Sequence, residues 1–206
     1  MKKSAILALS LSTIALAACC DCTTSQYVES NPSAIRLGVS SVQDVMIQGK
    51  GGKELEGNIT INGQTINALT YLSMKGGVLP EAKTRYTTYF FYNNKLVGKE
   101  TSSRFSKDST NFDVDKAKTI KNGTTLQQVV AELGKPSGTF IYPIAKNSGD
   151  TGIAYYNISI HPLPFEEKTE TVHEARISFD NNGKVDNVTV TDDTQTISFD
   201  AEILYF

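Results

Sequence analysis

Hydrophobic and polar positions divide the chain into an apolar start, a short polar stretch and two longer segments with helical and strand periodicity. Residues 1–18 begin with two lysines after the initiator Met and continue as a mostly apolar run, which is too short and wrongly flanked for a membrane-spanning helix. The run ends in Leu16-Ala17-Ala18-Cys19, where small residues precede a cysteine. This pattern predicts a secretory signal peptide that is cleaved before Cys19.

The cysteine after the cleavage point carries a second signal. Leu-Ala-Ala-Cys is similar to the lipobox of bacterial lipoprotein precursors, and the resemblance implies that the Cys19 thiol receives a diacylglyceryl group. Each buried methylene contributes about 0.8 kcal/mol, so two or three acyl chains hold a protein at a membrane where one does not. An ordinary secretory peptide is one alternative. Acylation of Cys20 is another, but it would put Ala17 at the Leu position.

The choice of cysteine bears on the destination of the protein. In one bacterial sorting scheme, an Asp directly after the lipidated Cys retains the protein in the inner membrane. Asp21 is first after Cys20 but second after Cys19, so lipidation at Cys19 favours the outer membrane. We therefore expect a periplasm-facing protein of the bacterial cell envelope, held at a membrane by its lipid anchor.

The mature chain is predicted to hold two domains. Residues 19–33 are polar and contain Pro32, which predicts a lipidated N-terminus followed by a flexible tether. A second polar and charged stretch, at 105–116, predicts a linker. The domains flanking it are 34–104 and 117–206, the latter with an extra strand at its C-terminal end.

The later domain opens with a well-marked helix. Thr124 followed by Gln127 matches a capping box at its start, and Gly134 with Pro136 marks its end. Apolar residues recur between them at helical spacing: Leu126, Val129, Val130 and Leu133. Strand patterns follow at 153–160, 174–179 and 185–191, with a turn at 180–184 before the last.

The earlier domain shows the same signals less cleanly. Ser41 and Asp44 predict a capped helix that ends at Gly49. Asn62-Gly63 predicts a hairpin turn. The order of a capped helix, an aromatic strand, an Asn-Asn turn and a further strand occurs in both domains, which indicates an internal duplication.

The second copy resembles a known family. IKNGTTLQQVVAELGKP is similar to the signature of the SmpA/OmlA (BamE-like) lipoprotein family, and the likeness continues through Tyr155-Tyr156 and ISFDNNGKVDNV, covering about 117–191. It implies two helices on one face of a three-stranded antiparallel sheet. The expected fold class is therefore α+β, a tandem repeat of this unit with a divergent first copy. Such a tandem also resembles the architecture of the β-lactamase inhibitor protein.

Composition excludes several kinds of partner. The three cysteines, Cys19, Cys20 and Cys22, all lie at the cleavage junction, so the folded body has no disulfide and no Cys-based metal site. Cleavage removes two lysines and takes the formal net charge from −2 to −4. We therefore expect no nucleic-acid partner.

Candidate chemistry is sparse. His161 and His173 lie in different segments without ligand spacing, so we expect no metal, no cofactor and no catalytic residue. An undetected hydrolase would require one of these histidines to lie beside a Ser or Asp in a pocket. The leading hypothesis is a non-enzymatic, membrane-anchored lipoprotein that binds an envelope protein, in outer-membrane protein assembly or envelope maintenance.

Four consecutive aromatic residues are the candidate partner-binding site: Tyr89, Phe90, Phe91 and Tyr92. On a strand, Tyr89 and Phe91 face one side while Phe90 and Tyr92 face the other, so one pair could form a contact surface. The simpler interpretation is that the second domain covers this aromatic surface. If the aromatics line an open concave cleft, the alternative function is a lipid-anchored inhibitor or ligand-binding module.

Overall fold

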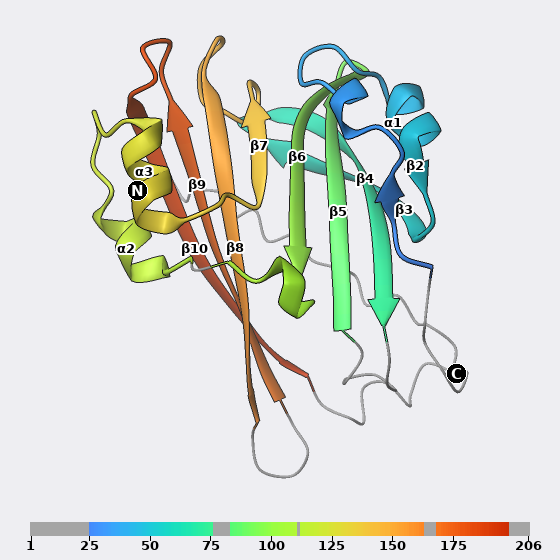
Figure 1. Ribbon diagram of the computed structural model, residues 1–206. Helices are drawn as coiled ribbons and strands as arrows, with labels where there is room; N and C mark the ends of the chain where they lie inside the picture. Colours follow the sequence, from blue (N-terminus) through green and yellow to red (C-terminus); the bar gives the residue numbers. More distant parts are fainter. Residues whose placement is uncertain (1–24, 76–82, 111, 163–167, 198–206) are drawn as a thin grey trace.

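The computed structural model describes residues 25–75, 83–110, 112–162 and 168–197, so the predicted signal peptide and Cys19 lie outside the described residues. An eight-stranded antiparallel sheet carries the fold (Figure 1). Its strands, in chain order and also in spatial order, are β3 (Lys53–Ile61), β4 (Gln64–Lys75), β5 (Lys83–Tyr92), β6 (Lys95–Ser103), β7 (Gly138–Ile141), β8 (Thr151–Pro162), β9 (Lys168–Phe179) and β10 (Val185–Ile197). Because every strand pairs with its neighbour in sequence, the sheet is a meander.

Short helical elements accompany the sheet. Before it come β1 (Val28–Glu29), the 3₁₀ helix η1 (Pro32–Ala34), α1 (Val42–Gln48) and β2 (Gly49–Lys50), and between β6 and β7 come η2 (Ser106–Asp108), α2 (Val114–Thr119) and α3 (Leu126–Leu133). β1 and β2 pair in a separate two-stranded sheet. Within the described ranges, no helix is long and apolar enough to cross a membrane.

Asparagine-containing turns fix two of the hairpins. The predicted turn between β3 and β4 is confirmed, with Asn62 at φ 50° and Gly63 at φ 76°. Between β5 and β6, Asn93 and Asn94 have φ values of 49° and 60°. Two successive residues with positive φ match the right-handed twist of the flanking strands, and asparagine tolerates this conformation better than most residues.

Capping boxes start both longer helices. The predicted box at α1 is confirmed, since Asp44 N donates to Ser41 Oγ at 3.2 Å and Ser41 N donates to Asp44 Oδ2 at 2.8 Å. At α3 the prediction is wrong by one residue, because the cap is Thr125 with Gln128. Thr124 instead donates its hydroxyl to a carbonyl of the preceding turn.

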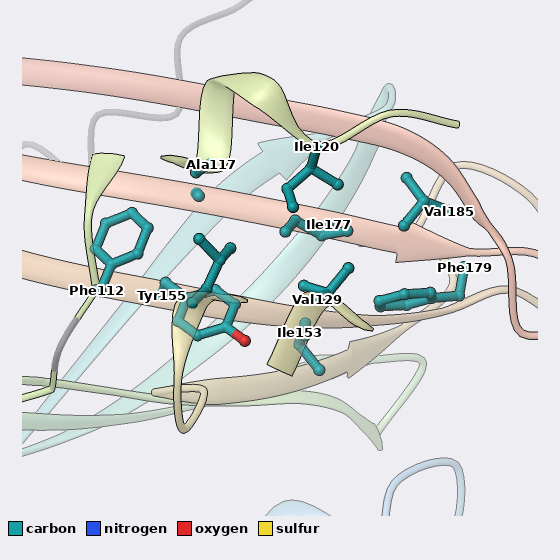
Figure 2. Close-up of a cluster of buried hydrophobic side chains, with 11 residues drawn as sticks. Phe112, Ala117, Ile120, Val129, Ile153, Tyr155, Ile177, Phe179 and Val185 are labelled. Atoms are coloured by element: carbon teal, nitrogen blue, oxygen red, sulfur yellow. The ribbon is translucent and has the colours of Figure 1, made fainter. Parts of the chain in front are cut away.

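One core lies between α2, α3 and the strands β8 to β10 (Figure 2). The Phe112 ring stacks on Tyr155 with centroids 5.4 Å apart. Within the predicted apolar stripe of α3, Val129 and Leu133 are buried, whereas Leu126 is 43% exposed. The core residues are Phe112, Ala117, Ile120, Val129, Leu133, Ile153, Tyr155, Ala175, Ile177, Phe179 and Val185.

A second core forms where the N-terminal segment packs over β4, β5 and the start of β6. It consists of Tyr27, Val45, Leu69, Tyr71, Tyr89, Phe91 and Leu96. Val45 of α1 is fully buried in it. A helix of seven residues is marginal in isolation, so this burial is what stabilises α1.

The other face of the sheet holds a third core, which includes Phe90, Phe140 and Ile144. Asn62, at the tip of the β3–β4 turn, donates its amide to the Pro143 carbonyl at 2.9 Å. The sheet is therefore curved, so that the β3–β4 hairpin contacts the loop that follows β7.

The two halves of the sheet meet at β7, which has four residues. Gly98–Glu100 of β6 pair with Gly138–Phe140, and β7 pairs in turn with the start of β8. Packing is so close here that a Cβ on Gly138 would lie 2.6 Å from Glu100 Cγ, and one on Gly152 would lie 2.1 Å from the Phe140 ring. Glycine is required at both positions for the halves to approach.

Polar side chains extend this joint beyond the end of β7. Tyr156 Oη donates to Glu100 Oε2 at 2.6 Å, and Arg176 Nη2 donates to the same oxygen at 2.8 Å. The Glu100 side chain is 4% exposed. Burial raises the pKa of its carboxyl, against the opposing charge of Arg176. These three residues link β6 directly to β8 and β9.

The expected fold class, a tandem repeat of a helix pair on a three-stranded antiparallel sheet, is wrong. The described chain is mostly β structure in one continuous eight-stranded sheet, because β7 pairs with both halves. Its three α-helices are short, and only one lies in the first half, where a long β3–β4 hairpin follows α1. The expected linker at 105–116 contains η2 and the start of α2.

We predict that Tyr156→Phe lowers the free energy of unfolding by about 1–3 kcal/mol, because it removes a donor from a buried carboxylate. Urea denaturation of the protein without residues 1–18 measures this change. Tyr92→Phe is the matched control, since Tyr92 is also half-buried but donates to the neutral Gln64 side chain. Equal losses in the two variants would contradict a special role for Tyr156.

Candidate functional site

A polar cleft opens on the helix-bearing face, beside the point where the described chain enters the fold. The N-terminal segment is held there by Tyr27, whose backbone N–H donates to Ser73 Oγ at 2.8 Å. The Tyr27 ring stacks on Tyr71 with centroids 4.1 Å apart. Residue alternation along β1 then points Tyr27 and Glu29 inward and leaves Val28 outside.

Glu29 is the central group of the cleft. Tyr89 Oη donates to Glu29 Oε1 at 2.6 Å, and Lys99 Nζ forms an ion pair with the same oxygen. The Glu29 side chain is only 10% exposed. Its second oxygen, Oε2, is buried without a hydrogen-bond partner among the described residues.

The two phenols form a donor chain toward this carboxylate. The hydroxyls of Tyr27 and Tyr89 are 2.8 Å apart, and because Tyr89 donates to Glu29, Tyr27 must donate to Tyr89. Burial raises the pKa of Tyr27 to about 12. Burial, followed by the hydrogen bond to Glu29, raises the pKa of Tyr89 well above its usual value. Both phenols are therefore fixed as donors.

A second ion pair forms the opposite wall. Arg85 Nε donates to Asp108 Oδ2 at 2.6 Å, and Ser103 Oγ donates to the same oxygen at 2.6 Å. Burial acts to raise the pKa of Asp108, but the hydrogen bonds from Arg85 and Ser103 outweigh it and hold the pKa below its usual range. The Arg85 guanidinium also lies over the Phe105 ring, 4.8 Å from its centroid.

The cleft between these walls has a volume of about 230 Å³. Its lining residues are Tyr27, Glu29, Arg85, Thr87, Lys99, Thr101 and Asp108. Two carboxylates and two cations balance in charge, and the lining contains neither histidine nor cysteine. The arrangement suits the binding of a polar group by hydrogen bonds and ion pairs.

Of the four predicted aromatic residues only Tyr89 reaches this cleft, and Tyr89, Phe90 and Phe91 are buried. The expected alternation is confirmed, since Tyr89 and Phe91 belong to the core under α1 and Phe90 to the core on the other face. Tyr92 is half-buried and donates to Gln64 Oε1 at 2.9 Å. Tyr89 thus contributes its hydroxyl to the site, and partner contact by the other three rings stays a prediction.

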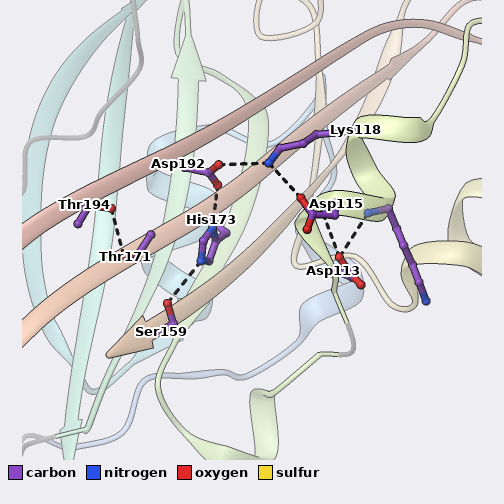
Figure 3. A network of polar contacts seen from close by, with 9 residues as sticks. Asp113, Asp115, Lys118, Ser159, Thr171, His173, Asp192 and Thr194 are labelled. Atoms are coloured by element: carbon purple, nitrogen blue, oxygen red, sulfur yellow. Dashed lines mark hydrogen bonds and ion pairs between the residues drawn. The ribbon is translucent and has the colours of Figure 1, made fainter. Parts of the chain in front are cut away.

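His173 lies in a polar row across three strands (Figure 3). Its Nδ1 is 2.7 Å from Asp192 Oδ1, and its Nε2 is 3.4 Å from Ser159 Oγ. The order resembles a nucleophile–base–acid relay, but the serine contact is long, Asp192 also pairs with Lys118, and none of these residues lines the cleft. Cross-strand pairing on a sheet face accounts for the row. The side chain of His161 lies outside the described residues.

No group of three or more His, Cys, Asp or Glu within the described ranges could hold a metal ion. Sequence reasoning missed Glu29, Lys99, Arg85 and Asp108. Glu29 falls in the stretch expected to be tether, where a two-residue strand leaves too short a pattern to detect. The other three are ordinary charged strand and loop residues until the fold brings them together.

We predict that Tyr89→Phe lowers the free energy of unfolding by about 1–3 kcal/mol, because both Glu29 and Tyr27 lose a hydrogen-bond partner in a buried site. Thermal or urea unfolding gives the value. The control is Tyr142→Phe, since the Tyr142 hydroxyl has no hydrogen bond within the described part of the chain. A loss no larger than the control's would argue against the donor chain.

Comparison with known proteins identifies no family. No family model matches the chain, and no curated protein matches it. One similar solved structure comes from Streptococcus mutans and is described as a "putative beta-lactamase inhibitor protein". It is 16% identical, covers 75% of this chain and 83% of its own, and superposes with a TM-score of 0.34. That likeness is too weak to carry any inference about function.

Proposed function

We propose that the protein is a lipoprotein of the bacterial cell envelope, anchored through Cys19, that binds a protein partner through the polar cleft. The lipobox-like Leu16-Ala17-Ala18-Cys19 supports the anchor. The resemblance of 117–191 to the SmpA/OmlA signature supports a setting in outer-membrane protein assembly or envelope maintenance. The cleft begins at Tyr27, only eight residues after the anchored cysteine, so a bound partner would be held close to the membrane.

The observation that carries the binding role is the unpartnered Oε2 of Glu29. A buried carboxylate oxygen without a donor costs free energy, and native proteins retain few such groups. A donor on a partner would supply the missing hydrogen bond once a shift of the Glu29 side chain turns this oxygen toward the cleft. Lys99 and Tyr89 both bind the other oxygen, Oε1, so the carboxylate is already oriented when that donor arrives.

The size of the cleft favours a protein over a small ligand. Pockets for drug-sized molecules measure roughly 300–1,000 Å³. At about 230 Å³ the cleft is smaller, and it suits one or two side chains that protrude from a larger surface. Its balanced charges favour a group with both donors and acceptors over a strongly charged one.

The anchor is tested by mass spectrometry of the mature N-terminal peptide. We expect cleavage before Cys19 and the mass of acyl groups on that residue. Cys19→Ala should abolish both changes, while Cys22→Ala should leave them intact. Acyl mass on Cys20, or no acyl mass, would contradict the proposed anchor.

The cleft is tested by filling it. Thr101→Arg places a bulky side chain in the cleft and should weaken partner binding about 30-fold, equivalent to about 2 kcal/mol at a binding hot spot. Thr60→Arg, at an exposed position on β3 outside the lining, should bind normally. The measurement is recovery of crosslinked envelope proteins from detergent-solubilised membranes. Equal recovery by both variants, or none by the parent protein, would refute the proposal.

A further inference from the structure

Exposed apolar side chains gather in the N-terminal segment. Within the described ranges the large hydrophobic residues with high exposure are Val28, Val39, Met46, Ile47 and Leu126, and all but Leu126 precede β2. Ile47 is 62% exposed, and Val28 and Val39 are each 59% exposed. Single exposed apolar residues need no explanation, but several in one short segment indicate a contact surface.

The local structure turns these side chains outward together. Val45 of α1 points into the core, so Ile47, two residues later, projects from nearly the opposite side of the helix, while Met46 lies at the border of the buried face and is 37% exposed. Ile47 and Val39 line the same shallow hollow, of about 270 Å³. Val28 lies on β1, which pairs with β2 directly after α1. We call these four residues the α1 apolar surface.

The proposed anchor holds this surface close to the membrane. Gly52 N donates to the Ser25 carbonyl at 2.8 Å, so the chain is fixed to the fold from Ser25 onward. Cys19 lies six residues earlier. Six residues span at most about 20 Å even when fully extended. An acylated Cys19 therefore keeps the entry to β1 within that distance of the bilayer surface.

We infer that the α1 apolar surface rests on the lipid bilayer that holds the anchor. This inference rests on the lipidation proposed above. Flanking charges are mixed, with Arg36 and Asp44 lining the hollow and Lys50 opposite Val28, so apolar contact with the lipid interface and not attraction to anionic headgroups carries the interaction. The contact orients the body: Val28 faces the lipid, while its two neighbours along the chain, Tyr27 and Glu29, point the other way and line the cleft.

The sequence contains no tryptophan, so a single introduced Trp reports its own surroundings. Ile47→Trp is placed in the full lipidated protein and reconstituted into phosphatidylcholine vesicles with brominated acyl chains. We expect a blue-shifted emission that these vesicles quench about twofold or more relative to unbrominated ones. Leu126→Trp on α3 is the matched control, 43% exposed in the native protein and outside the α1 apolar surface, and it should show no quenching.

Three kinds of result would contradict the inference that the α1 apolar surface rests on the bilayer. Equal quenching of the two tryptophans, or quenching of neither, in protein that floats with the vesicles would overturn the inference. A blue shift of Ile47→Trp that depends on protein concentration without vesicles would overturn it in favour of self-association. If the protein does not float and Cys19 carries no acyl mass, the proposed anchor itself fails, and the inference fails with it.

Discussion

A three-residue backbone ladder between β6 and β7 joins the two halves of the sheet, and the arrangement of everything else depends on it. Because the ladder keeps the strands in one continuous sheet, α1 in the first half and α2 and α3 in the second cover the same face. Glu100, Tyr156 and Arg176 strengthen the joint on the opposite face. Removing one partner of a buried ion pair leaves an uncompensated charge and typically costs about 3–5 kcal/mol, so the joint has little tolerance for change.

The cleft is a product of the same arrangement. It lies where the N-terminal segment stops covering β5 and β6, which leaves the inward-facing Arg85 and Lys99 at the edge of a core. Each cation is satisfied by a carboxylate from outside the sheet, Asp108 from η2 and Glu29 from β1. The N-terminal segment thus serves two surfaces at once. Its inner side completes the cleft, and its outer side carries exposed apolar residues.

Most local features were predictable from the sequence, apart from the cap of α3, which was placed one residue early, whereas long-range features were not. The Asn62-Gly63 turn and the Ser41–Asp44 cap depend on a few adjacent residues and were found correctly. Strand periodicity likewise located β8, β9 and β10, although each is longer than its apolar pattern. The joining of the two halves could not be predicted, because it depends on Gly138 approaching the Glu100 side chain, 38 residues earlier, and on Gly152 approaching the Phe140 ring. The cleft was missed for the same reason.

The position of Tyr27 has a consequence for the order in which the protein folds. Its contacts, Tyr71, Ser73 and Tyr89, all follow it by more than 40 residues, so the N-terminal segment cannot pack in place until β4 and β5 have formed. The strands of the meander can pair one after another, because each pairs with its neighbour in sequence. We therefore expect the N-terminal segment to dock late, after the strands that it covers have formed.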